Sequence, residues 1–380
     1  MTGPADPPRV AFVLGLATGG TASHVAALAA GCREAGLDVS LLGPAPTLAL
    51  VGESIASSAA VKAYRVPITD RLRPGSVAVA VTSLRSACAA WRPDVVHAHG
   101  VRAGALAGLA IGSMGRGSRP ALAVTVHNAP PDARAARLVH GGLERICARR
   151  ADLVLCASAD LLARMRRLGA SDAQQFDVAP EPLKPPSAEE IATARADIGA
   201  GDRPVFLTVG RLARQKGLDV LIAAAARWRD RDPRPRTVIA GEGPLAARLS
   251  AQASQADADV LFLGAREDVP ALLAVADVVI VPSRWEARAL ILQEAMRSGR
   301  PIVATNVGGT PELTGGDSAV LVPPDDSEAL AAAALRVLDD PALSARLGEA
   351  ASARSASFPT QKDGVNAAVS IYTGLANGRS

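Results

Sequence analysis

Aromatic residues, lysines and cysteines are scarce in this sequence of 380 residues. The shortages of aromatic residues and of cysteines limit the classes of protein to which the chain can belong. Phe, Trp and Tyr make up only 3% of the chain, although 49% of it is hydrophobic. Ala, Val and Leu must therefore form most of the core, which suits helices packed closely on a parallel sheet. The net charge is only +4 and no aromatic run accompanies it, so nucleic acid is not an expected partner.

The four cysteines have neither a paired spacing nor a metal-ligand spacing, which predicts buried thiols in a reducing compartment. They are Cys32, Cys88, Cys147 and Cys156. No apolar leader opens the chain, and no apolar run reaches the roughly 18 uncharged residues of a membrane span. We therefore expect a cytoplasmic protein, with peripheral contact at the inner membrane face as an alternative.

Short apolar runs bounded by Gly, Pro or Asp alternate with Ala-rich helical segments along the whole chain. The runs are continuous rather than alternating, which is typical of parallel strands buried on both faces. They span residues 10–16, 39–43, 63–68, 94–99, 122–127 and 153–157, then 205–209, 237–240, 260–263, 278–281, 302–304 and 320–322. Two series of six predict an α/β protein with two Rossmann-like, doubly wound parallel-sheet domains.

A proline-rich segment at residues 179–186 separates the two series. Prolines stiffen an extended connection and exclude a helix, so we place the domain junction there. The expected domains are residues 1–183 and 184–357. Residues 358–380 are expected to form a tail helix that packs across the junction.

The strongest local signal lies in Gly210–Gly217, which follows a predicted strand and opens a helix. Arg211 and Lys216 can converge there on one anion, and the helix N-terminus adds its own attraction for negative charge. A diphosphate leaving group needs such neutralisation. Two surface cations beside a glycine turn are the alternative interpretation.

Two glutamates form the second signal, Glu286 in a loop after a strand and Glu294 in the helix that follows. A carboxylate can accept hydrogen bonds from two neighbouring hydroxyls of a ribose or a hexose. A helix-capping glutamate and a surface glutamate would give the same pattern. Glycine turns at Gly241–Gly243 and Gly308–Gly309 follow other strands of this sheet, so we expect all these residues at its carboxyl edge.

In the order in which they occur, these motifs resemble glycosyltransferase family 4, a retaining family with the GT-B fold. Gly-Arg…Lys-Gly, Gly-Glu-Gly-Pro, Phe-Leu-Gly, Pro-Ser…Glu…Glu-Ala and Gly-Gly-Thr-Pro-Glu cover residues 205–323. The resemblance implies two domains facing a cleft and a nucleoside diphosphate sugar as donor. The implied reaction is metal-independent transfer of a hexose-type sugar, with no cofactor, to a small polyol, a glycan or a lipid-linked acceptor.

The resemblance also implies roles for individual residues. Arg211 and Lys216 would hold the donor diphosphate, Glu286 the transferred sugar and Glu294 the ribose. Further donor contacts are implied at Gly243, Ala265, Arg266, Glu267, Ala289 and Leu290. The chain reads Ala287-Arg288-Ala289 where family members usually have Gly-Phe-Gly, so a weak or inactive nucleotide-sugar-binding protein is the alternative function.

The N-terminal half offers Gly19 and Gly20 after its first predicted strand. They do not form Gly-x-Gly-x-x-Gly, and no acidic residue ends the next strand, which argues against a dinucleotide-dependent oxidoreductase. The two glycines resemble the family's Gly-Gly loop beside donor phosphate or acceptor. A simple strand-to-helix turn is the other interpretation.

All five histidines lie in this half. His127 ends a predicted strand, and the resemblance places it near the transferred sugar, so we predict that it positions the substrate. We expect His97 and His99, which alternate along one strand, to lie on opposite faces, and we predict no metal site.

Four arginines fall near one face of a predicted helix beyond His127. They are Arg134, Arg137, Arg145 and Arg149. Such a stripe could contact an anionic lipid surface and bring the enzyme to a lipid-linked acceptor. A solvated helix face is the simpler interpretation.

Overall fold

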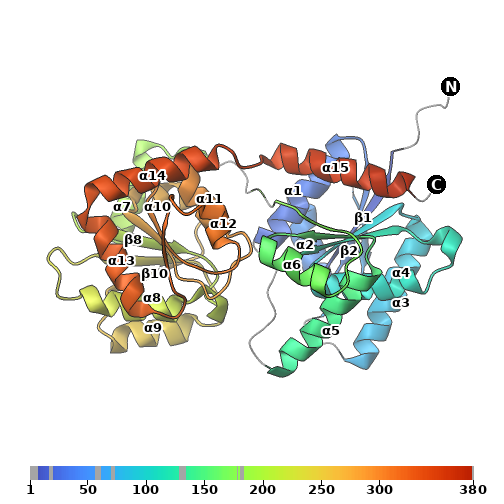
Figure 1. Ribbon diagram of the computed structural model, residues 1–380, viewed down its shortest axis with the longest axis horizontal. Coiled ribbons are helices and arrows are strands. Elements are labelled where there is room, and N and C mark those ends of the chain that lie inside the picture. Colours follow the sequence, from blue (N-terminus) through green and yellow to red (C-terminus); the bar gives the residue numbers. More distant parts are fainter. Residues whose placement is uncertain are drawn as a thin grey trace. The chain divides into compact units, whose positions relative to one another are not determined.

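The computed structural model describes residues 7–16, 20–55, 61–69, 73–127, 134–177, 179 and 184–378. The chain divides into two compact units (Figure 1). One comprises Met1–Ala179 together with Pro359–Ser380, and the other comprises Pro180–Phe358. Gly19, one of the predicted donor contacts, lies outside the described residues.

The first unit contains a parallel sheet of order β3-β2-β1-β4-β5-β6-β7. Its strands are β1 (Arg9–Leu14), β2 (Asp38–Gly43), β3 (Lys62–Arg65), β4 (Val95–His99), β5 (Ala121–Val126), β6 (Leu153–Cys156) and β7 (Ala173–Gln175). The first six match the apolar runs in the sequence. The seventh, Ala-Gln-Gln, was missed because it has no apolar run. It lies at the edge of the sheet and pairs with β6.

Seven α-helices belong to the described part of this unit. They are α1 (Gly20–Glu34), α2 (Ala45–Ile55), α3 (Pro74–Trp91), α4 (Val101–Gly112), α5 (Arg134–Arg150), α6 (Ala159–Arg167) and α15 (Gln361–Asn377), with a short 3-10 turn at Arg116–Ser118. The predicted tail helix is present as α15. The structure groups it with the first unit, where Val365, Ala368 and Tyr372 join the core formed by α1 and β1.

The second unit contains a parallel sheet of order β10-β9-β8-β11-β12-β13. Its strands are β8 (Val205–Val209), β9 (Arg236–Ala240), β10 (Val260–Gly264), β11 (Val278–Val281), β12 (Ile302–Thr305) and β13 (Val320–Val322). This order reverses direction between β8 and β11, as in a doubly wound Rossmann sheet. The predicted fold class of two such domains is confirmed.

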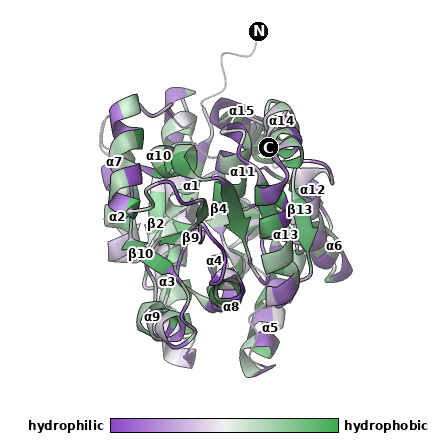
Figure 2. Ribbon diagram, turned by 90° about the vertical axis from the view of Figure 1, so that its left-hand side faces the viewer, coloured by the Kyte–Doolittle hydropathy of each residue, from purple (hydrophilic) through white to green (hydrophobic). Residues whose placement is uncertain are grey.

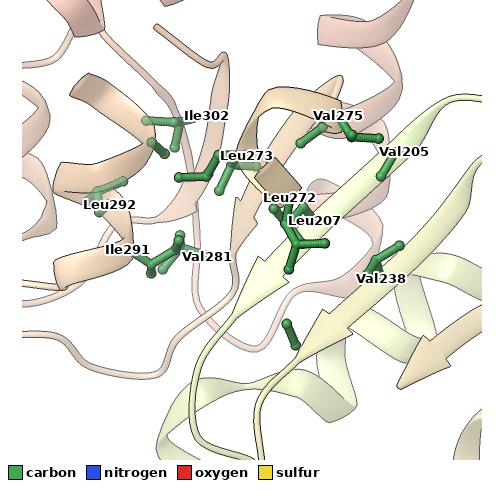
Figure 3. Close-up of a cluster of buried hydrophobic side chains, with 14 of the residues drawn as sticks. Val205, Leu207, Val238, Leu272, Leu273, Val275, Val281, Ile291, Leu292 and Ile302 are labelled. Carbon is green, nitrogen blue, oxygen red and sulfur yellow. The ribbon is translucent and has the colours of Figure 1, made fainter. Parts of the chain in front are cut away.

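Helices cover both faces of the second sheet. They are α7 (Ala188–Ile198), α8 (Leu218–Ala225), α9 (Ala246–Gln255), α10 (Val269–Val275), α11 (Leu290–Arg297), α12 (Thr310–Thr314), α13 (Ser327–Asp339) and α14 (Pro341–Ser355), with 3-10 turns at Arg214–Lys216 and Ala226–Trp228. Side chains alternate between the faces along each strand. Val205 and Leu207 face one buried cluster (Figure 3), whereas Phe206 between them faces another with Trp228.

Hydrophobic residues are concentrated in the strands and hydrophilic ones in the helices and loops (Figure 2). The four cysteines are buried free thiols, and burial raises the pKa of each thiol to about 11 or 12. Thiols that stay protonated are poor nucleophiles, so these residues act as core side chains. Among the described residues, no helix has both the length and the apolar character needed to cross a bilayer.

Candidate functional site

The loop after β8 lies against the chain that leaves β11. Gly217 has φ +62°, and a Cβ at this position would be 1.9 Å from the carbonyl oxygen of Pro282. Only glycine permits this approach. Two hydrogen bonds also join these loops. The Arg284 amide donates to the Gln215 carbonyl at 2.7 Å, and the Gln215 side chain donates to the Trp285 carbonyl at 2.8 Å.

Lys216 and Glu286, which the sequence assigns to two separate motifs, meet at this junction. Lys216 Nζ is 2.6 Å from Glu286 Oε1, and the Ser283 hydroxyl donates to the same oxygen at 2.6 Å. The Glu286 side chain is only 7% exposed and that of Lys216 24%. Ser283 was not singled out from the sequence, although it belongs to the Pro-Ser motif.

The glycine turns that follow β9 and β12 pack against the same loops. The Gly309 amide donates to the Glu286 carbonyl at 2.8 Å, and a Cβ at Gly308 would lie 2.0 Å from that oxygen. A Cβ at Gly241 would lie 2.0 Å from the Gly210 carbonyl oxygen, and one at Gly243 2.4 Å from that of Leu212. The structure therefore brings the predicted motifs of the second unit together at one edge of its sheet.

The other residues predicted at this edge differ in their burial and in their contacts. Arg211 is exposed just beyond β8 and forms no ion pair with the residues that the structure describes. Glu294 lies on α11, where burial raises its pKa and the positive charge of Arg297 partly offsets the shift. Ala289 precedes α11 and is buried, Leu290 begins that helix, and no acidic residue occupies its first turn.

The segment after β10 carries three residues that are predicted to contact the donor. Ala265 and Glu267 are exposed. Arg266 donates to Asp268 at 2.7 and 2.6 Å and to Asp197 of α7 at 3.0 Å, and these hydrogen bonds raise its pKa. The Arg266 guanidinium is thus engaged with two carboxylates.

At Ala287-Arg288-Ala289, where family members usually have Gly-Phe-Gly, none of the three residues is fully exposed. Ala287 and Ala289 are buried, and the Arg288 guanidinium carbon lies 5.4 Å from the centre of the Phe358 ring. A cation over an aromatic face is held by the ring quadrupole. The bulky residue is therefore directed onto Phe358, and the Glu286 backbone keeps its contact with Gly309.

Four histidines gather at the carboxyl edge of the first sheet. His97 and His99 lie on β4, His127 follows β5 and His24 lies on α1. The expectation that His97 and His99 lie on opposite faces was wrong, because residues two apart on a strand share a face. Their ring centroids are 4.1 Å apart. Gly20, the described member of the predicted glycine pair, is exposed and begins α1.

Burial dominates the electrostatics of this group. It lowers the pKa of His24 to about 4 and those of His97 and His127 to about 3, and it lowers that of His99 well below 6.5. The four rings are therefore neutral at pH 7. Within the described ranges, no three or more His, Cys, Asp or Glu side chains are arranged to hold a metal ion.

A cavity of about 450 Å³ lies at the opposite edge of the second sheet. Asp277, Arg300 and Pro301, which precede β11 and β12, line it together with residues of α14. Open parallel sheets bind their ligands at the carboxyl ends of the strands. The motif residues, rather than this cavity, therefore locate the candidate site.

Comparison with known proteins agrees with this arrangement. Residues 190–354 match the family described as glycosyl transferases group 1, and residues 19–181 match the glycosyl transferase 4-like domain. The chain is 31% identical to glycogen synthase from Mycobacterium tuberculosis over 314 residues, which is 76% of this chain and 70% of that enzyme. It is 33% identical to alpha-D-kanosaminyltransferase from Streptomyces kanamyceticus over 189 residues, so the match spans about half (48%) of each.

The fold is also that of HepE from Anabaena, solved with UDP-glucose, with a TM-score of 0.79 and 21% identity over 98% of this chain and 99% of that one. A GT-B fold with family 4 motifs at one sheet edge defines a glycosyltransferase. The chain belongs to glycosyltransferase family 4, which confirms the resemblance seen in its sequence.

We predict that Gly217→Ala lowers the free energy of unfolding of the second unit by at least 2 kcal/mol more than Gly199→Ala, a rough figure for a buried clash. Both glycines have φ near +60°, so the left-handed strain of about 1–2 kcal/mol is common to both. Only Gly217 has a carbonyl in the way, since nothing lies within 4 Å of a Cβ at Gly199. Urea unfolding of both variants measures the difference, and equal stabilities would contradict the close approach.

We predict that the first unit loses stability as the pH falls from 7 to 5. We predict that the second unit does not lose stability over this range. The folded pKa values of the four histidines lie below the ordinary 6.5, so below that pH the unfolded chain takes up protons that the folded unit does not. The second unit contains no histidine and is an internal control. Hydrogen–deuterium exchange resolved by peptide measures both, and equal loss of protection in the two units would contradict the prediction.

Proposed function

We propose that this enzyme transfers a sugar from a nucleoside diphosphate sugar to an acceptor, with retention of the anomeric configuration and without a metal ion. The observation that carries the proposal is the Lys216–Glu286 pair at the carboxyl edge of the second sheet, beside the exposed Arg211. A cation and a carboxylate held within one loop cluster match the two ends of such a donor. The diphosphate is anionic, and the sugar offers hydroxyl donors.

The chemistry of the step requires negative charge to be stabilised as the bond from the anomeric carbon to the diphosphate breaks. Lys216 and Arg211 would supply that stabilisation from the loop after β8. Glu286 would accept hydrogen bonds from the sugar hydroxyls. Glu294 would accept them from the ribose, since its carboxylate forms no hydrogen bond with another residue in the described part of the chain.

The relatives support a class of donor, but they do not specify one donor or one acceptor. HepE, solved with UDP-glucose, supports a nucleotide-sugar donor for this chain. The acceptor is proposed as a sugar, a polyol or a lipid-linked molecule that contacts the first unit near His127. A catalytically inactive binding protein gains no support from these relatives, which are named as transferase and synthase.

We predict that Arg211→Ala and Lys216→Ala each lower kcat about 100-fold or more, as loss of a charge partner of the transition state does. Arg211 is exposed, so Arg211→Ala should leave the melting temperature unchanged and separate catalysis from folding. Lys362→Ala, at an exposed position of α15, is the control and should keep wild-type turnover.

Transfer and hydrolysis are measured with a panel of nucleoside diphosphate sugars. Wild-type kcat in both site variants would refute the assignment of these cations. Donor binding by calorimetry without transfer or hydrolysis in the wild-type protein would favour the inactive alternative.

We further propose that the enzyme is cytoplasmic and docks on an anionic membrane through the first half of α5. Leu138 and Val139 are 79% and 55% exposed there, next to the exposed Arg134 and Arg137. Exposed apolar side chains flanked by arginines suit the boundary between lipid headgroups and acyl chains. The second half of α5 is anchored by its buried Glu144, which accepts two hydrogen bonds from Arg164 of α6. Arg145 and Arg149, also exposed, extend the basic surface along it.

We predict that replacing Leu138 and Val139 together by Ser lowers binding to vesicles containing phosphatidylglycerol at least tenfold, a rough figure for two apolar side chains withdrawn from lipid. Val79→Ser is the matched control, because Val79 of α3 is 56% exposed and lies outside this surface. Vesicle sedimentation measures both. Undiminished binding by the double variant, or no binding by the wild-type protein, would contradict the membrane contact.

A further inference from the structure

We propose that His99 is a positioning residue that fixes the ring orientation and tautomer of His127, and that α15 holds this arrangement through Tyr372. The inference rests on the proposed function, in which His127 contacts the substrate. Neither the resemblance nor the comparisons assign a role to His99 or Tyr372.

His99 meets His127 through one nitrogen only. His99 Nδ1 is 3.4 Å from His127 Nε2, and the rings are nearly parallel at 12° with centroids 5.7 Å apart. The other nitrogen of His99, Nε2, is buried with no hydrogen-bond partner in the described part of the chain. His127 is thus the one hydrogen-bonding contact that the structure gives the His99 ring.

Two neutral imidazoles joined by one hydrogen bond have one donor and one acceptor. Each ring has a single N–H, so the proton position on His99 determines which nitrogen of His127 is protonated. The lowered pKa values of both residues support the neutral state at pH 7. The remaining nitrogen of His127, Nδ1, then has one defined hydrogen-bonding role towards a ligand.

His99 is held in place from several sides and is only 4% exposed. Its ring stacks on Phe12 of β1 at 5.9 Å and 28°, and His24 of α1 meets it edge-on at 5.9 Å. His97 lies 4.1 Å away on the same strand. A ring packed against three others cannot rotate to another hydrogen-bonding geometry without displacing them.

His97 connects this packing to the C-terminal helix. Its Nδ1 is 2.6 Å from the Tyr372 hydroxyl of α15, and its Nε2 is 2.6 Å from the Thr125 hydroxyl of β5. Tyr372 is fully buried and its ring also lies edge-on to Phe12. A residue of the tail helix thereby orders the strand end from which His99 reaches His127.

The test compares two amides that imitate different nitrogens of His99. The side-chain amide of Asn can take the place of Nδ1, whereas that of Gln takes the place of Nε2, which has no partner. We expect His99→Gln to lower kcat about 100-fold, the order of the loss that follows a misplacement of about 1 Å in a positioned group. We expect His99→Asn to stay within about threefold of the wild-type kcat, with little change in the KM for the donor in either variant.

A double-mutant cycle asks whether His99 acts through His127. In a His127→Ala background, His99→Gln should lower kcat less than twofold further, because the ring that it positions is absent. A His99→Gln effect of the same size in both backgrounds would overturn the proposal. So would wild-type kcat in His99→Gln.

Nitrogen NMR of ¹⁵N-histidine-labelled protein provides a readout that is independent of activity. The wild-type spectrum at pH 7 should show His127 as one neutral tautomer, and His99→Gln should convert it to a mixture. A mixture of tautomers, or a charged ring, in the wild-type protein would overturn the proposal. If no donor supports transfer, the proposed function fails while this spectrum still tests the His99–His127 contact.

Discussion

The ion pair between Lys216 and Glu286 depends on backbone approaches that only glycine allows. Gly217 brings the loop after β8 onto the Pro282 carbonyl, and Gly308 brings the loop after β12 onto the Glu286 carbonyl. A Cβ at Gly217 would lie 1.9 Å from the Pro282 carbonyl oxygen and one at Gly308 2.0 Å from that of Glu286, so a larger residue at either place would push against the loops that hold the 2.6 Å contact between Nζ and Oε1. The position of the two charged side chains therefore depends on the absence of a Cβ atom at Gly217 and at Gly308.

Such a pair is suited to a ligand that replaces part of it. Burying two charges without other partners carries a desolvation penalty that their attraction barely offsets, so the pair adds little to stability. Ser283 also donates to Glu286, so Glu286 would keep this hydrogen bond if Lys216 moved towards the diphosphate of the proposed donor.

The sequence predicted the strands well because parallel strands buried on both faces are continuous apolar runs. It failed at β7, whose Ala-Gln-Gln has no such run and lies at an edge. It predicted that Lys216 and Glu286 share one edge, because the carboxyl ends of parallel strands coincide. It could not predict that Arg266 is engaged by Asp197, since that carboxylate comes from a helix 69 positions away. Nor could periodicity place the tail helix, because an amphipathic face does not specify which core it covers.

The strand order of each sheet reverses at one point, and the candidate residues of each unit lie at that point. In the second sheet the strand order reverses between β8 and β11, which carry Arg211, Lys216 and Glu286 in their following loops. In the first it reverses between β1 and β4, where α1 begins at Gly20 and β4 ends at His99. At a reversal the adjacent helices lie on opposite faces, so the strand ends between them remain uncovered. The same open edge therefore receives charged side chains in one unit and neutral imidazoles in the other. Under the proposed function, the charged edge would bind the anionic diphosphate and the neutral edge would receive an uncharged hydroxyl of the acceptor.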